Sequence, residues 1–187
     1  MKRHRYLSRE GDMDVGGRRQ HRRVACLNAD ISGYSRLIAA DVERTVRVLK
    51  TVQAVLGTVI TKHGGRVVDL VGDNLLAEFD TVACAVRCGV EIQHELERRN
   101  ASLPARWQVR FRIGIERGDA LALGGRLYGN CVNVAARVQQ MAAPGSVCLA
   151  GAAHDDLDGS LPLRFEDLGE HAVKNIDLPL RIYRVES

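Results

Sequence analysis

The chain is poor in aromatic side chains, which make up 4% of its 187 residues. A core with so few rings must consist of Val, Leu, Ile and Ala, and 45% of all residues are hydrophobic. No stretch approaches the roughly 18 uninterrupted apolar residues that a membrane-spanning helix requires. The basic residues 1–5 resemble the start of a signal peptide, but no apolar segment follows them. These absences argue against a secreted or integral membrane protein, and the composition is that of a globular chain.

Cysteine patterns with metal-binding or redox spacing are also missing. The chain has five cysteines, an odd number, and no C-x-x-C pair. Cys84 and Cys88 stand four positions apart in an apolar helical pattern, which is typical of small core residues. A disulfide scaffold or a zinc site is therefore not expected, and we predict a protein of the reducing cytoplasm.

Positive charge is concentrated at one end of the chain. Residues 1–23 carry eight Lys and Arg against three acids, a net of +5, whereas residues 24–187 carry nineteen against twenty, a net of −1. Because the basic segment lacks apolar periodicity, we predict a disordered tail over 1–22 and one folded domain over 23–187. A solvated leader or a misassigned start codon is the favoured interpretation of this tail. No stable nucleic-acid or membrane partner is expected, although such a tail is able to contact polyanions.

Apolar periodicity predicts the order of helices and strands. Helices are expected over 41–62, 81–99, 129–141 and 151–158. Strands are expected over 24–29, 66–71, 75–79, 107–116, 120–123, 147–150, 163–167 and 180–185. Gly118 and Asp119 are expected to form a turn between two strands. The order β-α-β-β-α-β predicts an α+β fold with helices on one face of an antiparallel sheet, namely a ferredoxin-like split βαβ sheet with a C-terminal extension.

Two aspartates lie where predicted strands end. Asp30 ends the first strand, and Asp73 lies at the tip of the hairpin that follows the first helix. Because these strands are neighbours in a split βαβ sheet, both carboxylates emerge at one edge. Paired hard oxygen ligands suit Mg²⁺ or Mn²⁺, and two such ions can activate an attacking oxygen and stabilise a leaving one. Taken singly, Asp30 is equally well interpreted as a helix cap and Asp73 as a turn residue.

A loop and a helix offer groups that suit a nucleotide. Asn133 and Arg137 stand four apart and share one helix face, where an amide can bond a ribose oxygen and a guanidinium matches phosphate oxygens. An exposed polar face is the alternative interpretation of this spacing. The segment between the first strand and the next helix has backbone N–H groups able to hold a triphosphate; its residues are Ile31, Ser32, Gly33, Tyr34 and Ser35.

In their order and spacing these motifs resemble the catalytic domain of class III nucleotidyl (adenylate/guanylate) cyclases over about residues 22–186. The stretches that carry the resemblance are 29–35, 71–74, 111–115, 128–137 and 168–174. The resemblance implies a head-to-tail homodimer with nucleoside triphosphate sites at its interface. It also implies attack of the ribose 3′-oxygen on the α-phosphate, which gives a cyclic nucleotide and pyrophosphate. Positioning and electrostatic stabilisation would do most of the catalysis.

The resemblance also implies roles for individual residues. Asp30 and Asp73, with the backbone of Ile31, would hold two divalent metals, Mg²⁺ or Mn²⁺. Asn133 would orient the ribose and Arg137 would stabilise the pentavalent phosphorus, both from the other subunit. The groups expected at the phosphates are Ser32, Gly33, Tyr34, Ser35 and, at the β- and γ-phosphates, Lys174.

The two base-reading positions depart from the family pattern. Adenylate cyclases carry a lysine four residues before the second metal aspartate, where this chain has Asp69. An aspartate or threonine is usual three residues before Gly129, where this chain has Arg126. Guanine would suit both, because Asp69 could accept from N1–H and the 2-amino group while Arg126 donates to O6. Guanylate cyclases carry an acid at the Asp69 position, and uracil would also be compatible.

Other interpretations stay open at this point. Asp69 and Arg126 could form a salt bridge with each other, which would leave a loosely selective cyclase or a catalytically silent nucleotide-binding module. Family frequency favours ATP as the substrate and the two side chains favour GTP. A palm-type nucleotidyltransferase that makes a dinucleotide is a further alternative, which the helix with Asn133 and Arg137 argues against.

Overall fold

The fold was analysed in a computed structural model that describes residues 19–159, 161–173, 176 and 178–186, so Lys174 of the predicted site lies outside the described residues. The first half of the chain contains β1 (Gln20–Ile31), α1 (Tyr34–Ala40), α2 (Val42–Lys62), β2 (Arg66–Val71), β3 (Asn74–Phe79) and α3 (Val82–Asn100). The second half contains the 3₁₀ turn η1 (Ala105–Trp107), β4 (Phe111–Leu123), β5 (Arg126–Tyr128), α4 (Asn130–Met141), β6 (Val147–Ala150), α5 (Gly151–Asp155), β7 (Arg164–His171) and β8 (Leu180–Glu186).

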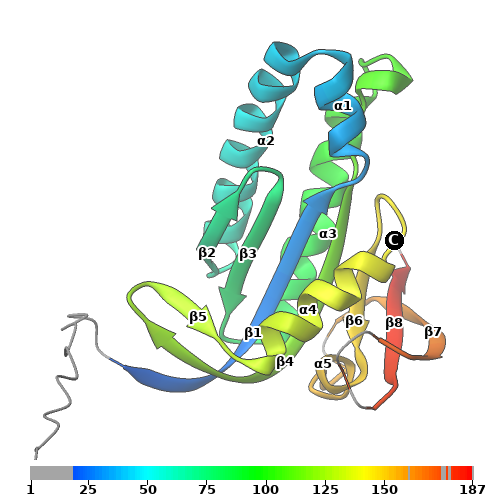
Figure 1. The fold of residues 1–187 in the computed structure, drawn as a ribbon. Coiled ribbons are helices and arrows are strands. Elements are labelled where there is room, and N and C mark those ends of the chain that lie inside the picture. Colours follow the sequence, from blue (N-terminus) through cyan, green and yellow to red (C-terminus); the bar gives the residue numbers. More distant parts are fainter. Residues whose placement is uncertain (1–18, 160, 174–175, 177, 187) are drawn as a thin grey trace, which may run out of the picture.

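All strands belong to one sheet (Figure 1). Its order is β2-β3-β1-β4-β6-β8-β7, and β5 pairs with β4 outside that path. The segment β2-β3-β1-β4, with α2 and α3, is the predicted split βαβ arrangement, and β6 to β8 form the C-terminal extension. The α+β fold class is therefore confirmed. No helix in the described part of the chain combines the length and the apolar character needed to span a bilayer.

Helices cover both faces of the sheet, so the expectation of helices on one face is wrong. Residues such as Leu27 and Ile113 pack against α2 and α3, whereas Val24 and Cys26 pack against Cys131 and its neighbours on α4. In Figure 1, α4 crosses one side of the sheet while α3 lies behind it. This arrangement follows from the alternation of side chains along β1 and β4, which buries apolar groups on both faces.

Glycine on β4 allows α4 to approach the sheet closely. A Cβ atom at Gly114 would lie 2.2 Å from the backbone nitrogen of Gln139 and 2.4 Å from the carbonyl oxygen of Ala135. The backbone of α4 therefore rests on the backbone of β4, with no side chain between them. This contact fixes the position of the helix that carries Asn133 and Arg137.

β4 is one continuous strand, so the turn expected at Gly118 and Asp119 is wrong. Gly118 pairs with Val24 and Asp119 pairs with Arg23 on β1, and the long partner strand holds both in extended conformation. The chain turns instead at Gly124 and Gly125, whose φ values are +57° and +79°. β1 itself begins at Gln20, four residues before the expected strand and inside the segment predicted as tail.

The start of β4 also differs from the expected strand over 107–116. Trp107 ends η1, where the Arg44 guanidinium lies 4.2 Å from its ring centroid. The Asn100 side chain accepts from the Val109 N–H at 2.9 Å and donates to the Val109 carbonyl at 2.7 Å. Because these backbone groups are already bonded, the segment before Phe111 does not join the sheet.

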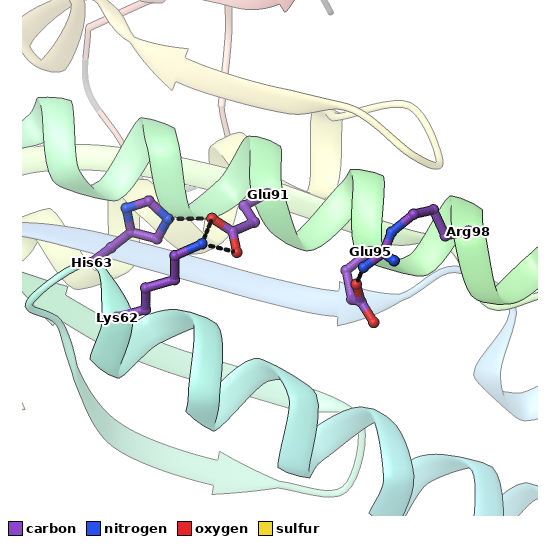
Figure 2. Close-up of polar contacts among 5 residues, drawn as sticks. All are labelled: Lys62, His63, Glu91, Glu95 and Arg98. Atoms are coloured by element: carbon purple, nitrogen blue, oxygen red, sulfur yellow. Dashed lines mark hydrogen bonds and ion pairs between the residues drawn. The ribbon is translucent and has the colours of Figure 1, made fainter.

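The helices α2 and α3 are joined by charged side chains, as Figure 2 shows. Lys62 Nζ lies 2.7 and 2.9 Å from the two oxygens of Glu91, and His63 Nε2 lies 2.8 Å from one of them. These contacts, led by the hydrogen bond from Lys62, lower the pKa of Glu91. His63 is the C-cap residue of α2, and its ring bonds to the neighbouring helix α3. Farther along α3, Glu95 pairs with Arg98.

Candidate metal and nucleotide site

The structure brings Asp30 and Asp73 together at one edge of the sheet. β1 pairs with β3 so that Ala29 faces Leu75, which places Asp30 beside the turn that contains Asp73. Burial raises the pKa of Asp73, and the negative charge of Asp30 raises it further, whereas a backbone hydrogen bond with Ile31 lowers it. Two carboxylates that influence each other in this way favour a cation between them.

Arg112 is a third member of this group that the sequence analysis did not single out. It faces Asp30 in the β1–β4 ladder, and its Nε and Nη2 donate to the two oxygens of Asp30 at 3.0 and 2.7 Å. The signal was present in the sequence, because Arg112 alternates with the core residues Phe111 and Ile113. Its pairing with Asp30 is set by the register of β1 and β4, which the sequence does not show.

The donor set fits a hard divalent cation. Asp30 and Asp73 offer carboxylate oxygens. Ile31, the last residue of β1, offers a backbone carbonyl. Oxygen ligands of both kinds suit Mg²⁺ or Mn²⁺. The described residues contain no cluster of three or more His, Cys, Asp or Glu side chains able to hold a metal. A cation at this edge would therefore complete its shell with oxygens from water or from a bound ligand, as Mg²⁺ does when it binds with substrate phosphates.

The predicted phosphate-binding segment adjoins the aspartates. The Ser32 N–H donates to the Arg110 carbonyl at 2.9 Å, and Gly33 adopts a left-handed conformation with φ of +72°. Ser32 is half-buried, whereas Gly33 and Ser35 are exposed. Tyr34 packs against the core and so anchors the segment.

Asn133 and Arg137 lie on α4 and point away from its buried side. Val134 and Val138 are buried against the sheet, Asn133 is exposed, and Arg137 is half-buried. Arg137 donates to the Gln140 side chain at 3.0 Å. Among the described residues, no hydrogen bond or ion pair connects either residue with Asp30 or Asp73. A single chain therefore does not assemble the two halves of the predicted site.

Asp69 lies on β2 and Arg126 lies on β5, two strands that do not pair with each other, since β2 pairs with β3 and β5 pairs with β4. A bulge separates Val67 and Asp69 in the pairing with β3, and Asp69 Oδ1 accepts from the Leu70 N–H at 2.9 Å. The strands are linked by Arg66, which donates to the Gly125 carbonyl at 3.1 Å. Within the described ranges no ion pair joins Asp69 to Arg126, so the salt bridge considered above is not found.

Exposed apolar side chains lie on the elements that carry these residues. They occur on β2, β5 and α4 and are Leu70, Val71, Tyr128 and Met141. Val71, with 68% of its surface exposed, directly precedes the turn that contains Asp73.

Comparison with known proteins identifies the family and the fold of this chain. An adenylate/guanylate cyclase/hydrolase from Silicibacter pomeroyi is 35% identical, with a TM-score of 0.79 over 90% of this chain and 98% of that one. The adenylyl cyclase CyaB from P. aeruginosa, 20% identical, shares the fold, with a TM-score of 0.80 over 91% and 96%. A Rhizobium meliloti (strain 1021) protein named "Putative adenylate cyclase 3" is 36% identical over 165 residues, which are 88% of this chain and 28% of that protein.

The chain spans well under half the length of the curated relatives that it matches first. The family model described as "Adenylate and Guanylate cyclase catalytic domain" matches residues 17–186, nearly the whole chain. The chain thus belongs to the family of adenylate and guanylate cyclase catalytic domains.

Proposed function

We propose that this chain converts a nucleoside triphosphate, ATP or GTP, to the 3′,5′-cyclic nucleotide and pyrophosphate at the interface of a homodimer. One observation carries the proposal. Asp30 and Asp73 lie close together where β1 ends and β3 begins. Asn133 and Arg137, which belong to the same set of family motifs, lie on the face of α4 that points away from the sheet. Two copies arranged head to tail would supply both halves to each site.

Asp30 and Asp73, with the Ile31 carbonyl, would hold two Mg²⁺ or Mn²⁺ ions. When bound, such ions favour ionisation of the attacking hydroxyl and neutralise charge on the leaving group. Arg112 neutralises Asp30 in the structure, and its guanidinium would donate to a triphosphate oxygen bound at the same edge. Burial raises the pKa of Asp73, so a neighbouring positive charge would help to keep its carboxylate ionised.

The partner copy would contribute the positioning and stabilising groups. Asn133 would hold the ribose so that its 3′-oxygen faces the α-phosphate, and Arg137 would donate to the phosphoryl oxygens as charge develops. The backbone of α4 packs directly on Gly114 of β4, and this contact holds the helix that carries both side chains in place. Val71 on β2 and Tyr128 on β5 are exposed apolar residues that such an interface would be able to cover.

The substrate base follows from Asp69 and Arg126. Asp69 is exposed after the β2 bulge and Arg126 is exposed at the start of β5, so both are accessible to a ligand. An acid and a guanidinium complement the donors and the acceptor of guanine better than those of adenine. We therefore expect GTP to be used better than ATP by this chain.

The test is turnover with Mn²⁺ and each of ATP, GTP, CTP and UTP, with the cyclic product identified by mass. Asp73→Ala and Arg137→Ala variants should each be inactive, and Asp80→Ala, an exposed acid outside the site, should retain activity. Mixing the two inactive variants should restore activity, because one site of each mixed dimer is then complete. Absence of any cyclic product from folded, dimeric protein would refute the proposal and leave a nucleotide-binding module.

A further inference from the structure

Two cysteine thiols are buried against each other where α4 meets the sheet. Cys26 lies on β1 and Cys131 is the second residue of α4, and their Sγ atoms lie 3.6 Å apart. The two residues are 0% and 4% exposed, and both are free thiols in the structure. They stand 105 positions apart in the sequence, and the proposed reaction uses neither of them. We call Cys26 and Cys131 the thiol pair.

The packing of α4 on β4 holds Cys131 against Cys26. A Cβ atom at Gly118 would lie 2.9 Å from the Cβ atom of Cys131, so the first turn of α4 rests on a part of β4 that has no side chain. Gly118 pairs with Val24 in the β1–β4 ladder, two residues before Cys26. The Cys131 thiol also donates to the carbonyl oxygen of Asp119 at 3.6 Å. The contact between the two sulfur atoms is therefore set by the backbone on both sides.

The two thiols differ in their tendency to ionise. The Cys26 thiol donates to Cys131 Sγ, and this hydrogen bond lowers the pKa of Cys131, which burial opposes and a backbone hydrogen bond at Val132 supports. The same bond and burial raise the pKa of Cys26. Glu78 on β3 and Glu116 on β4, which face Cys26 from either side, raise it further. The pair therefore combines one thiol that ionises with one that keeps its proton.

We propose that the thiol pair is a redox site, at which a hydroperoxide such as hydrogen peroxide converts Cys26 and Cys131 to a disulfide bond that fixes α4 to β1. First the Cys131 thiolate attacks a peroxide oxygen: an S–O bond forms, the O–O bond breaks, and the hydroxide that leaves takes up a proton to become water. The Cys26 sulfur then attacks the sulfur of the sulfenic acid at Cys131. The S–S bond forms, the S–O bond breaks, and the leaving hydroxide takes the Cys26 proton. In sum, two thiols lose two electrons and one peroxide is reduced to two waters.

The start of α4 provides the route by which a small oxidant reaches Cys131. Asn130 and Asn133, on either side of it in the sequence, are exposed, and Val132 is half-buried. The first turn of a helix has N–H groups without partners inside the helix, and helix ends open more readily than helix interiors. Cys26 lies beneath on the central strand, where it attacks the oxidised Cys131 rather than the oxidant.

Oxidation of the thiol pair would move the helix that carries Asn133 and Arg137. The sulfur atoms of a disulfide lie about 2.05 Å apart, so they must approach by about 1.5 Å from their separation of 3.6 Å. β1 is paired on both sides, with β3 and β4, so the start of α4 is the part that shifts. Asn133 lies two residues from Cys131. The effect on turnover, unlike the chemistry of the thiols, rests on the proposed cyclase function.

The first test follows the bond itself. Folded parent protein is treated with hydrogen peroxide, its remaining thiols are alkylated, and its peptides are mapped by mass spectrometry with and without dithiothreitol. A peptide with Cys26 joined to a peptide with Cys131 should appear only without dithiothreitol. The oxidised parent should also unfold at higher urea than the reduced parent, because the bond closes a loop of 105 residues in the unfolded chain. Absence of the joined peptides, or a lower urea midpoint after oxidation, would overturn the proposal.

The second test follows turnover. Peroxide should lower kcat of the parent by about tenfold or more, since a misplacement of about 1 Å has effects of this size, and dithiothreitol should restore it. Cys26→Ala and Cys131→Ala should keep their own activity in peroxide. Cys84→Ala, which removes a half-buried thiol of α3, serves as the control and should respond like the parent.

The outcomes separate the two proposals. Protection by Cys84→Ala, with inactivation of the Cys26 and Cys131 variants, would assign the loss of activity to α3 and overturn control by the thiol pair. Joined peptides in a parent whose turnover does not change on oxidation would likewise overturn the displacement of α4. Joined peptides in a protein that makes no cyclic nucleotide even when reduced would support the redox site and refute the cyclase proposal instead.

Discussion

Asp30 and Arg112 face each other across the β1–β4 ladder, and the guanidinium contacts both oxygens of the carboxylate, at 3.0 and 2.7 Å. Asp73 belongs to the same group, since Asp30 raises its pKa and Arg112 lowers it. The side chains of Asp30 and Arg112 are 19% and 30% exposed, so their charges are only partly screened by water. One cationic side chain therefore compensates two acids that would otherwise repel each other.

Replacement of Arg112 should make the protein depend on divalent cations for stability. Arg112→Gln leaves Asp30 and Asp73 uncompensated, so the free energy of unfolding should fall by about 1–2 kcal/mol at neutral pH. Mn²⁺ should then raise the melting temperature of this variant more than that of the parent. Thermal unfolding with and without Mn²⁺ measures both effects, with Arg87→Gln as the control. Equal Mn²⁺ shifts in variant and parent would contradict the idea that Arg112 and a cation compensate the same acids.

Glu116 should make stability decrease as pH rises through neutrality. It faces Cys26 on β1 and is 5% exposed, and burial raises its pKa to about 7, although a hydrogen bond from the Arg117 N–H opposes this. The nearby thiols of Cys26 and Cys131, 3.6 Å apart, provide no positive charge. Because the folded state keeps a proton that the unfolded chain loses near pH 4.5, stability is greatest below that pH and is lost as pH rises to about 7.

The measurement is urea unfolding at pH 5 and pH 8. From pH 5 to pH 8, Glu116 should lower the free energy of unfolding of the parent by on the order of 3 kcal/mol. The free energy of unfolding of Glu116→Gln should fall by correspondingly less over the same range. Glu43→Gln, at an exposed position of α2, should follow the parent. The assignment fails if Glu116→Gln and the parent show the same difference between pH 5 and pH 8.

Gly114 should be intolerant of even a methyl group. A Cβ atom there would overlap the backbone of α4 at Gln139 and Ala135, so Gly114→Ala should destabilise the fold by about 2–3 kcal/mol. Because the helix must move, activity should fall even where the variant is folded. Gly57→Ala on α2, where nothing lies within 4 Å, should instead stabilise by about 0.5–1 kcal/mol. Unfolding midpoints and turnover at low temperature distinguish the two positions.

Exchange of the charges at the base-reading positions should change the preferred nucleotide. The double variant Asp69→Lys, Arg126→Asp offers the donor and acceptor that adenine requires, so the ratio of kcat/KM for ATP over GTP should rise by about tenfold or more. Arg87→Gln, at an exposed position of α3, serves as the control. An unchanged ratio would show that Asp69 and Arg126 do not contact the base.

Patterns within one segment could be predicted from the sequence. The apolar spacing of α2 gave its extent to within one residue, because Asp41 caps the helix and the side chain accepts from the Arg44 N–H at 2.9 Å. The convergence of Asp30 and Asp73 followed from the split βαβ topology alone. These features depend on local chemistry or on a topology with few alternatives.

Features that depend on pairing between distant segments could not be predicted. Gly118 and Asp119 have the composition of a turn, but pairing with Val24 and Arg23 outweighs this local preference. The bulge before Asp69 leaves no mark in the sequence, and the contact between Asp30 and Arg112 requires the strand register. The roles of Asn133, Arg137 and Lys174 stay predictions that the proposed experiments test.

β4 has a consequence for the two sites of the proposed dimer. This strand runs for 13 residues, or about 40 Å, from Arg112 beside the aspartates to the hairpin with β5, and it supports α4 on the way. In a head-to-tail dimer one copy of β4 would contribute Arg112 to one site and carry α4 toward the other. The same strand would then contact both sites, so nucleotide binding at one site should alter the nucleotide affinity of the other. Titration of the dimer with nucleotide should therefore give a Hill coefficient different from one.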